Sequence, residues 1–241
     1  MTSRLRSILS LLLILLSTSV SFAQKSEPVH EAPNRSEVEI KKAPFAPRLM
    51  LGATGGVNLS NVLLQPSLRQ TLHIGYDGGV ILRYDVVPYA GIWLEVDYSS
   101  RGWTEVHDDL PDYQYDRTIN FLNVPVMTHF MIGNGSLKLT IDAGAHFGYY
   151  LGEHSTVTPL PEDSEVIPFD KHHEIPVQNP FFWGVGGGIG AEYHFGSHFV
   201  GGLRGSYVYG FGDLFKNSRS DIFVKSSEQI IAFKAYLLYA F

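Results

Sequence analysis

The sequence predicts an all-β fold, an eight-stranded antiparallel up-and-down transmembrane β-barrel. First, segments in which apolar and polar residues alternate recur along the chain, and 228–241 is the clearest, with Ile231, Phe233 and Leu237 on one face and Lys234 on the other. Second, no apolar run after the N-terminal region approaches the roughly 20 residues that a membrane-spanning helix needs. Third, short and long connections alternate between the strands. Together these patterns favour strands that separate lipid from an enclosed interior.

The N-terminal residues have the features of a targeting segment. Arg4 and Arg6 precede an apolar run over 8–16, and Ser21 and Ala23 have the spacing of a signal peptidase site. We therefore expect residues 1–23 to be a cleaved signal peptide and the cell outer membrane to be the destination. Residues 24–47 contain four prolines among charged and small residues, which predicts a flexible periplasmic linker. The barrel is expected to occupy residues 48–241.

Eight segments have the length and alternation of barrel strands. Their expected bounds are 48–60, 72–84, 89–101, 118–132, 137–152, 181–195, 199–211 and 228–241. The connections 85–88, 133–136 and 196–198 are short, whereas 61–71, 102–117, 153–180 and 212–227 are long. Outer-membrane barrels have short periplasmic turns and long outer loops, so the lengths also predict the orientation.

The positions of the aromatic residues indicate which face meets lipid. A soluble lipocalin-type barrel would alternate too, but it would have no reason to collect rings at both strand ends. Rings at the ends with aliphatic residues between them are typical of a membrane girdle. The predicted girdle comprises Tyr84, Phe130, Tyr193, Phe195, Phe199, Tyr239 and Phe241 at the periplasmic end, and Tyr98, Tyr149, Trp183 and Tyr209 at the outer end.

The opposite face carries glycine and charged residues, and we expect it to line the lumen. Eight strands enclose only enough space for side chains, so paired charges would fill it. The network is either structural or pore-lining, and the small bore favours the structural interpretation. Its predicted members are Asp77, Arg83, Glu95, Asp97, Asp142, Glu192, Arg204 and Lys234.

Several short motifs are similar to a known family. Phe121-Leu-Asn-Val-Pro-Val-Met after Arg117, Leu94-Glu-Val-Asp-Tyr98, and the Gly-rich segment 184–195 resemble strands of the PorT-like outer-membrane β-barrel family, of the porin-like class. This resemblance implies an eight-stranded barrel in a Gram-negative outer membrane. The protein that gave the family its name assists a secretion system, but the arginine-rich strand motif of that subgroup is missing here.

The sequence offers weak candidates for chemistry in the outer loops. The adjacent His172 and His173 could bind a divalent metal, but neighbouring side chains on an extended chain point apart. Glu153, His154 and Ser155 contain the residue types of a hydrolytic triad without its spacing or a nucleophile motif. We therefore predict no catalytic site, no metal site and no cofactor.

The composition also limits the partners. The chain has no cysteine, and loss of Arg4 and Arg6 with the signal peptide changes the net charge from −6 to −8, which argues against nucleic acid. The expected partners are outer-membrane lipid, the barrel-assembly machinery through the C-terminal strand, and an unidentified surface or envelope protein. The proline-rich segment 153–180 is either a recognition loop or a flexible cover.

The sequence thus predicts an integral outer-membrane β-barrel protein with a structural or surface-presentation role. The alternatives are a narrow porin-like solute pore and a secretion-assisting component of the PorT type. A lipid-modifying enzyme of the outer membrane is a more distant alternative.

Overall fold

The computed structural model describes residues 45–107, 110–158, 171–217 and 222–241. The predicted signal peptide, residues 1–23, and the predicted linker as far as residue 44 lie outside the described residues. Within the described part, no helix is long and apolar enough to span a membrane.

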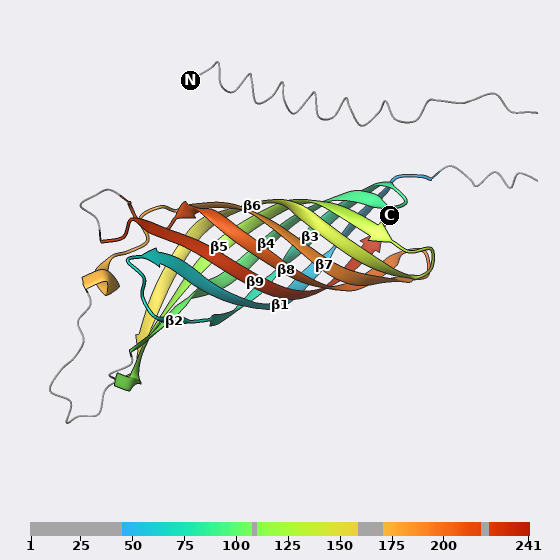
Figure 1. Ribbon diagram of the computed structural model, residues 1–241. Coiled ribbons are helices and arrows are strands. Elements are labelled where there is room, and N and C mark those ends of the chain that lie inside the picture. Colours follow the sequence, from blue (N-terminus) through green and yellow to red (C-terminus); the bar gives the residue numbers. More distant parts are fainter. Residues whose placement is uncertain (1–44, 108–109, 159–170, 218–221) are drawn as a thin grey trace, which may run out of the picture. The chain divides into compact units, whose positions relative to one another are not determined.

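Eight long antiparallel strands close into a barrel (Figure 1). Each strand pairs with its neighbours in chain order, and β1 pairs with β9 to complete the ring of hydrogen bonds. The predicted fold class is therefore confirmed. The strands are β1 (Arg48–Gln65), β3 (His73–Val87), β4 (Ala90–His107), β5 (Leu110–Ile132), β6 (Leu137–Val157), β7 (Phe181–Phe195), β8 (Phe199–Asp213) and β9 (Lys225–Ala240). A two-residue strand, β2 (Gln70–Thr71), pairs with the outer part of β4, and a short 3₁₀ helix spans Lys171–Glu174.

Alternation along each strand separates an outward apolar face from an inward face. On β9, Ile231, Phe233 and Leu237 are exposed, whereas Lys234 and Tyr236 between them are buried. A period of two gives each face a different environment, so the hydrophobic pattern also fixes the register against the neighbouring strands.

Two glycines enable the tight turns at the end of the barrel that carries the short connections, which is called the periplasmic end after the predicted orientation. Gly133, between β5 and β6, has φ of 137°, and Gly196, between β7 and β8, has φ of 67°. Residues other than glycine rarely adopt these backbone angles. The turns stay short because the chain can reverse within a few residues at these positions.

The predicted loop over 102–117 is wrong for most of its length. β4 continues to His107 and β5 starts at Leu110, and Trp103 pairs with Arg117 along the way. β1 and β6 likewise extend five residues beyond their predicted outer ends, to Gln65 and Val157. Trp103 and Tyr115 on the inward face stay buried there, but outward residues such as Gln114 meet water and can be polar. The outward apolar face that marks a membrane-crossing strand is therefore missing from these extensions.

The extended strands make one side of the barrel taller than the other. β5 has 23 residues and β6 has 21, whereas 9–11 tilted residues are enough to cross a membrane. Figure 1 shows the β4–β5 hairpin projecting beyond the other strands at the end opposite the short turns. The outer opening of the barrel is therefore bordered by a sheet on this side.

Candidate functional site

The lumen is filled by side chains in layers. One apolar cluster occupies the periplasmic half and a second occupies the outer half. Charged residues lie beside and between the two clusters. The periplasmic cluster contains Met50, Ile81, Trp93, Met127, Val200, Tyr236, Leu238 and Ala240, and the outer cluster contains Val62, Leu64, Trp103, Ile119, Phe121, Phe182, Val208, Leu214, Phe215, Phe223 and Ile230.

Arg83 organises the charges in the periplasmic half. Its guanidinium lies 2.7 Å from Asp85 Oδ1 through Nε and 2.6 Å from Glu192 Oε2 through Nη1. His129 lies between Glu192, at 3.3 Å, and Asp142, at 2.5 Å. All five side chains are almost fully buried. Buried charges are stable only when they are paired and hydrogen-bonded. Loss of any one of these side chains would therefore leave another buried group without its partner.

A second ionic cluster lies near the middle of the barrel. Lys234 Nζ donates to Glu95 Oε1 at 2.7 Å and also contacts Asp97 Oδ2. Arg204 Nη2 donates to Glu95 Oε2 at 2.6 Å, and its guanidinium lies 4.8 Å from the ring centroid of Trp93. Strands β4, β8 and β9 are thus joined across the lumen by two cations and two carboxylates.

Arg101 and Glu228 form a third buried pair, within the outer apolar cluster. Arg101 Nε lies 3.0 Å from Glu228 Oε1, without the alignment of a hydrogen bond. The guanidinium also lies between two rings, 4.0 Å from the centroid of Phe121 and 4.2 Å from that of Phe182. Cation–π contacts of this kind are strongest at desolvated sites, and the Arg101 side chain is only 1% exposed.

Above the outer cluster, Arg117 ties the segment after the 3₁₀ helix to the barrel. It donates to Glu153 Oε2 at 2.7 Å and to the carbonyl oxygen of Ile175 at 2.5 Å. His173 stacks on Tyr115 with ring centroids 3.6 Å apart. Burial raises the pKa of the Tyr115 phenol, although the charge of Arg117 acts in the opposite direction. Specific contacts therefore hold residues 173–177 against β5 and β6 at the outer end.

Little space remains between the layers. A cavity of about 30 Å³ lies beside Asp97, Arg101, His146 and Arg204. Each of these residues has a buried polar atom without a hydrogen-bond partner. A water needs about 10–15 Å³ measured in this way, so the cavity has room for one or two waters that would satisfy some of these atoms.

The comparisons with known proteins agree with this architecture. A family model described as outer membrane protein beta-barrel domain matches residues 22–216. The chain belongs to this family of outer-membrane β-barrel proteins. Its outward apolar face is accordingly the face that meets lipid in the outer membrane.

Among solved structures, one outer-membrane barrel has a similar fold, and others align with the chain at lower TM-scores. The outer membrane protein OprG from Pseudomonas aeruginosa is 11% identical, with a TM-score of 0.52, over 82% of this chain and 97% of OprG. The attachment invasion locus protein Ail of Yersinia pestis is 16% identical, with a TM-score of 0.38, over 80% of this chain and 98% of Ail. Neisserial surface protein A is 12% identical, with a TM-score of 0.41, over 80% of this chain and 97% of that protein. No curated protein matches the sequence significantly.

The structure places all eight predicted lumen residues inside the barrel. Arg83, Asp142 and Glu192 belong to the periplasmic network, and Glu95, Asp97, Arg204 and Lys234 to the central one. Asp77 accepts a hydrogen bond from Asn58 Nδ2 at 3.2 Å. The predicted girdle residues whose rings are exposed on the outward face are Tyr84, Tyr98, Phe130, Tyr149, Trp183, Tyr193, Phe195, Phe199, Tyr239 and Phe241. Tyr209 is half-buried and accepts a hydrogen bond from Lys225.

Sequence reasoning missed the large side chains of the lumen. Trp93, Arg101 and Trp103 occur on the inward face of β4 at the same alternation as Glu95 and Asp97. A signal was therefore present, since residues two apart on a strand share a face. We expected only small residues and charges in the lumen, so these positions were not assigned to it. The apolar layers that fill the lumen in fact contain bulky rings.

The weak chemical candidates remain separate in the structure. Glu153 is engaged by Arg117 and by the amide of Val177. Ser155 pairs with Arg117 across the ladder, and His154 comes between Glu153 and Ser155 on β6, so it faces the other side. The side chain of His172 lies outside the described residues. Among the residues that the structure does describe, no three potential ligands converge on a metal position.

Proposed function

We propose that this protein is a non-conducting, non-enzymatic barrel that anchors a raised outer sheet and its loops at the cell surface. The single observation that carries the proposal is the filled lumen. Two apolar layers and three groups of buried, paired charges occupy the path that a solute would take. A hydrated pore lined by free charges would instead leave those charges exposed to water.

The charge network around Arg83 and the ionic cluster around Lys234 support this role, because both connect strands across the lumen. Arg83 on β3 reaches Glu192 on β7, and Lys234 on β9 reaches Glu95 on β4. Cross-lumen pairs of this kind hold the wall at a fixed diameter. Such a wall is a rigid base for the sheet that β4, β5 and β6 raise beyond the lipid.

Conductance of the purified protein in planar lipid bilayers tests the closed lumen. We expect no stable stepwise openings under conditions in which a wide porin, used as the positive control, opens readily. Sustained openings of the wild-type protein would replace this proposal with the narrow solute pore.

Surface presentation can be tested separately on intact cells. A peptide tag inserted after His107, between β4 and β5, should bind its antibody without permeabilisation. A matched tag inserted after Ser197, in the turn between β7 and β8, should bind only after permeabilisation. If the second tag were the accessible one, the assigned orientation and the presentation role would both be wrong.

The secretion-assisting role implied by the resemblance to PorT-like proteins stays a prediction, as do the barrel-assembly machinery and an envelope protein as partners. Recovery of secretion components with the cross-linked protein from whole envelopes would favour the secretion-assisting role.

A further inference from the structure

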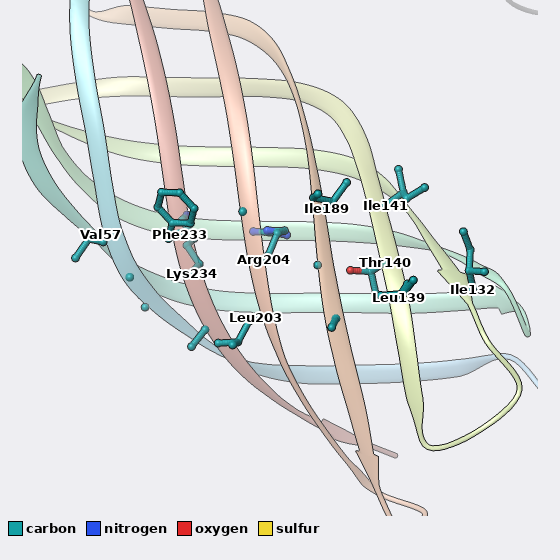
Figure 2. Close-up of a pocket in the computed structure, with 16 residues that line it drawn as sticks. Val57, Ile132, Leu139, Thr140, Ile141, Ile189, Leu203, Arg204, Phe233 and Lys234 are labelled. Carbon is teal, nitrogen blue, oxygen red and sulfur yellow. The ribbon is translucent and has the colours of Figure 1, made fainter.

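A long apolar groove crosses the lipid-facing surface of the barrel. It has a volume of about 820 Å³ and extends over β1, β9, β8, β7 and β6 to the end of β5. Figure 2 shows its side chains arranged in two rows, with Val57, Phe233, Ile189 and Ile141 in one and Leu203, Leu139 and Ile132 in the other. The backbone of the strands between the rows forms the floor.

Strand register explains why the side chains fall into two rows that follow the curved wall. Residues that are paired across neighbouring strands lie side by side, so a chain of such pairs makes a line perpendicular to the strands. One line is Val57, Phe233, Gly205, Ile189 and Ile141, and the other is Gly55, Ala235, Leu203, Ala191, Leu139 and Ile132. The second line crosses six strands, so at about 4.8 Å per strand it is about 24 Å long.

Small outward residues make the groove deep. Gly55, Ala191, Gly205 and Ala235 leave space beside long neighbours such as Ile189, which is 72% exposed. Arg204 and Lys234 also border the groove, but their charged groups are engaged with Glu95 inside the barrel. The surface offered to the lipid is therefore almost wholly apolar.

The groove lies in the periplasmic half of the membrane. Ile132 directly precedes the periplasmic turn that begins at Gly133, whereas Gly55 lies seven residues along β1 from its periplasmic start at Arg48. Strands in such barrels are tilted by about 35–45°, so a line of about 24 Å perpendicular to them rises by roughly 15 Å. The hydrocarbon core is about 30 Å thick, so the groove spans the depth of one leaflet.

We propose that this groove binds one acyl chain of a phospholipid from the periplasmic leaflet. Its length, its apolar lining and its depth in the membrane match an extended hydrocarbon chain. A water-soluble ligand would have to cross lipid to enter it. A second copy of the barrel would have to present a ridge that fits into the groove. The inference depends on the lipid-facing orientation of the wall and not on whether the lumen conducts.

Filling the groove tests the proposal directly. The variant Ala191→Leu/Gly205→Leu adds two side chains to the two rows. A Cβ at Gly205 would lie 3.5 Å from the Phe233 ring, an ordinary van der Waals contact, so we expect the barrel to fold. The matched control is Ala145→Leu, which adds the same side chain to the outward face of β6 away from the groove. Heat-modifiable migration on gels establishes folding of each protein.

Two measurements follow, with phosphatidylglycerol as the probe. Native mass spectrometry after detergent exchange should find one retained phospholipid on the wild-type protein and on the control, and at least fivefold less on the filled variant. Phosphatidylglycerol with a diazirine in its acyl chain should cross-link mainly to residues 189–205 and 233–235. The proposal is overturned by cross-links spread evenly around the barrel, by equal retention in the filled variant, by retention of lipopolysaccharide instead, or by a dimer that the filled variant dissociates.

Discussion

Replacement of Arg101 by methionine tests whether the outer part of the lumen is dry. The side chains of Arg101 and Glu228 are each 1% exposed, and Arg101 Nε lies 3.0 Å from Glu228 Oε1. Arg101→Met would leave Glu228 as a buried carboxylate without its cation. Breaking a buried pair in this way destabilises proteins by about 3–5 kcal/mol. Loss of two cation–π contacts adds to this, at about 1–2 kcal/mol each in a desolvated site.

The double variant Arg101→Met/Glu228→Met should behave differently. Methionine fills the space of the arginine stem and packs well between aromatic rings such as Phe121 and Phe182. With both charges removed, no buried ion is left unpaired, so we expect a free energy of unfolding within about 2 kcal/mol of wild type. The effect of the double variant should thus be smaller than that of either single variant.

Equilibrium unfolding in urea with lipid vesicles, followed by gel mobility and tryptophan fluorescence, gives the free energies for this cycle. Arg48→Met, on a half-buried arginine at the periplasmic start of β1, is the matched control and should change the stability by about 0.5 kcal/mol or less. A loss below about 1 kcal/mol for Arg101→Met would mean that water reaches Glu228. The layered, closed lumen would then be refuted at this level.

Four further substitutions, one of them a control, test other parts of the barrel. Gly184→Ala should prevent folding or strongly destabilise the barrel in the same urea assay, because its Cβ would lie 2.3 Å from a carbonyl oxygen of β8. The control Gly78→Ala should be tolerated, because the atom nearest to its Cβ would lie 4.0 Å away. Trp93→Ala should lower the free energy of unfolding by about 3–5 kcal/mol, since it empties a fully buried site. Arg117→Met should release residues 173–177 and increase their hydrogen exchange while the barrel stays folded; unchanged exchange would show that other contacts hold this segment.

The membrane-crossing parts of the fold could be predicted because the wall has lipid on one side and the packed lumen on the other. Alternation on β7 gave its bounds, Phe181–Phe195, to the residue. Beyond the lipid this contrast is lost, so the outer parts of β4 and β5 had the composition of a loop. β2 has only two residues and carries no pattern that could be recognised.

The partners inside the lumen could not be predicted from the sequence. Arg101 and Glu228 lie on β4 and β9, and nothing in their local sequence specifies the stagger between strands that are far apart in the chain. The same limit applies to the lipid-facing groove, where Gly55, Ala235 and Ala191 share a line only once the register of four strands is known. The face on which a residue lies follows from alternation within its own strand. Contacts across the barrel depend on the stagger between strands, the shear of the barrel.

The unequal height of the wall has a consequence for how large molecules can approach the cell-surface side. β5 continues for about a dozen residues past the length that a membrane requires, which at about 3.3 Å per residue and a tilt near 45° raises its tip by roughly 28 Å. The barrel rim is therefore oblique. On the β4–β6 flank, a bulky molecule moving in the plane of the membrane therefore meets the raised sheet before it meets the rim.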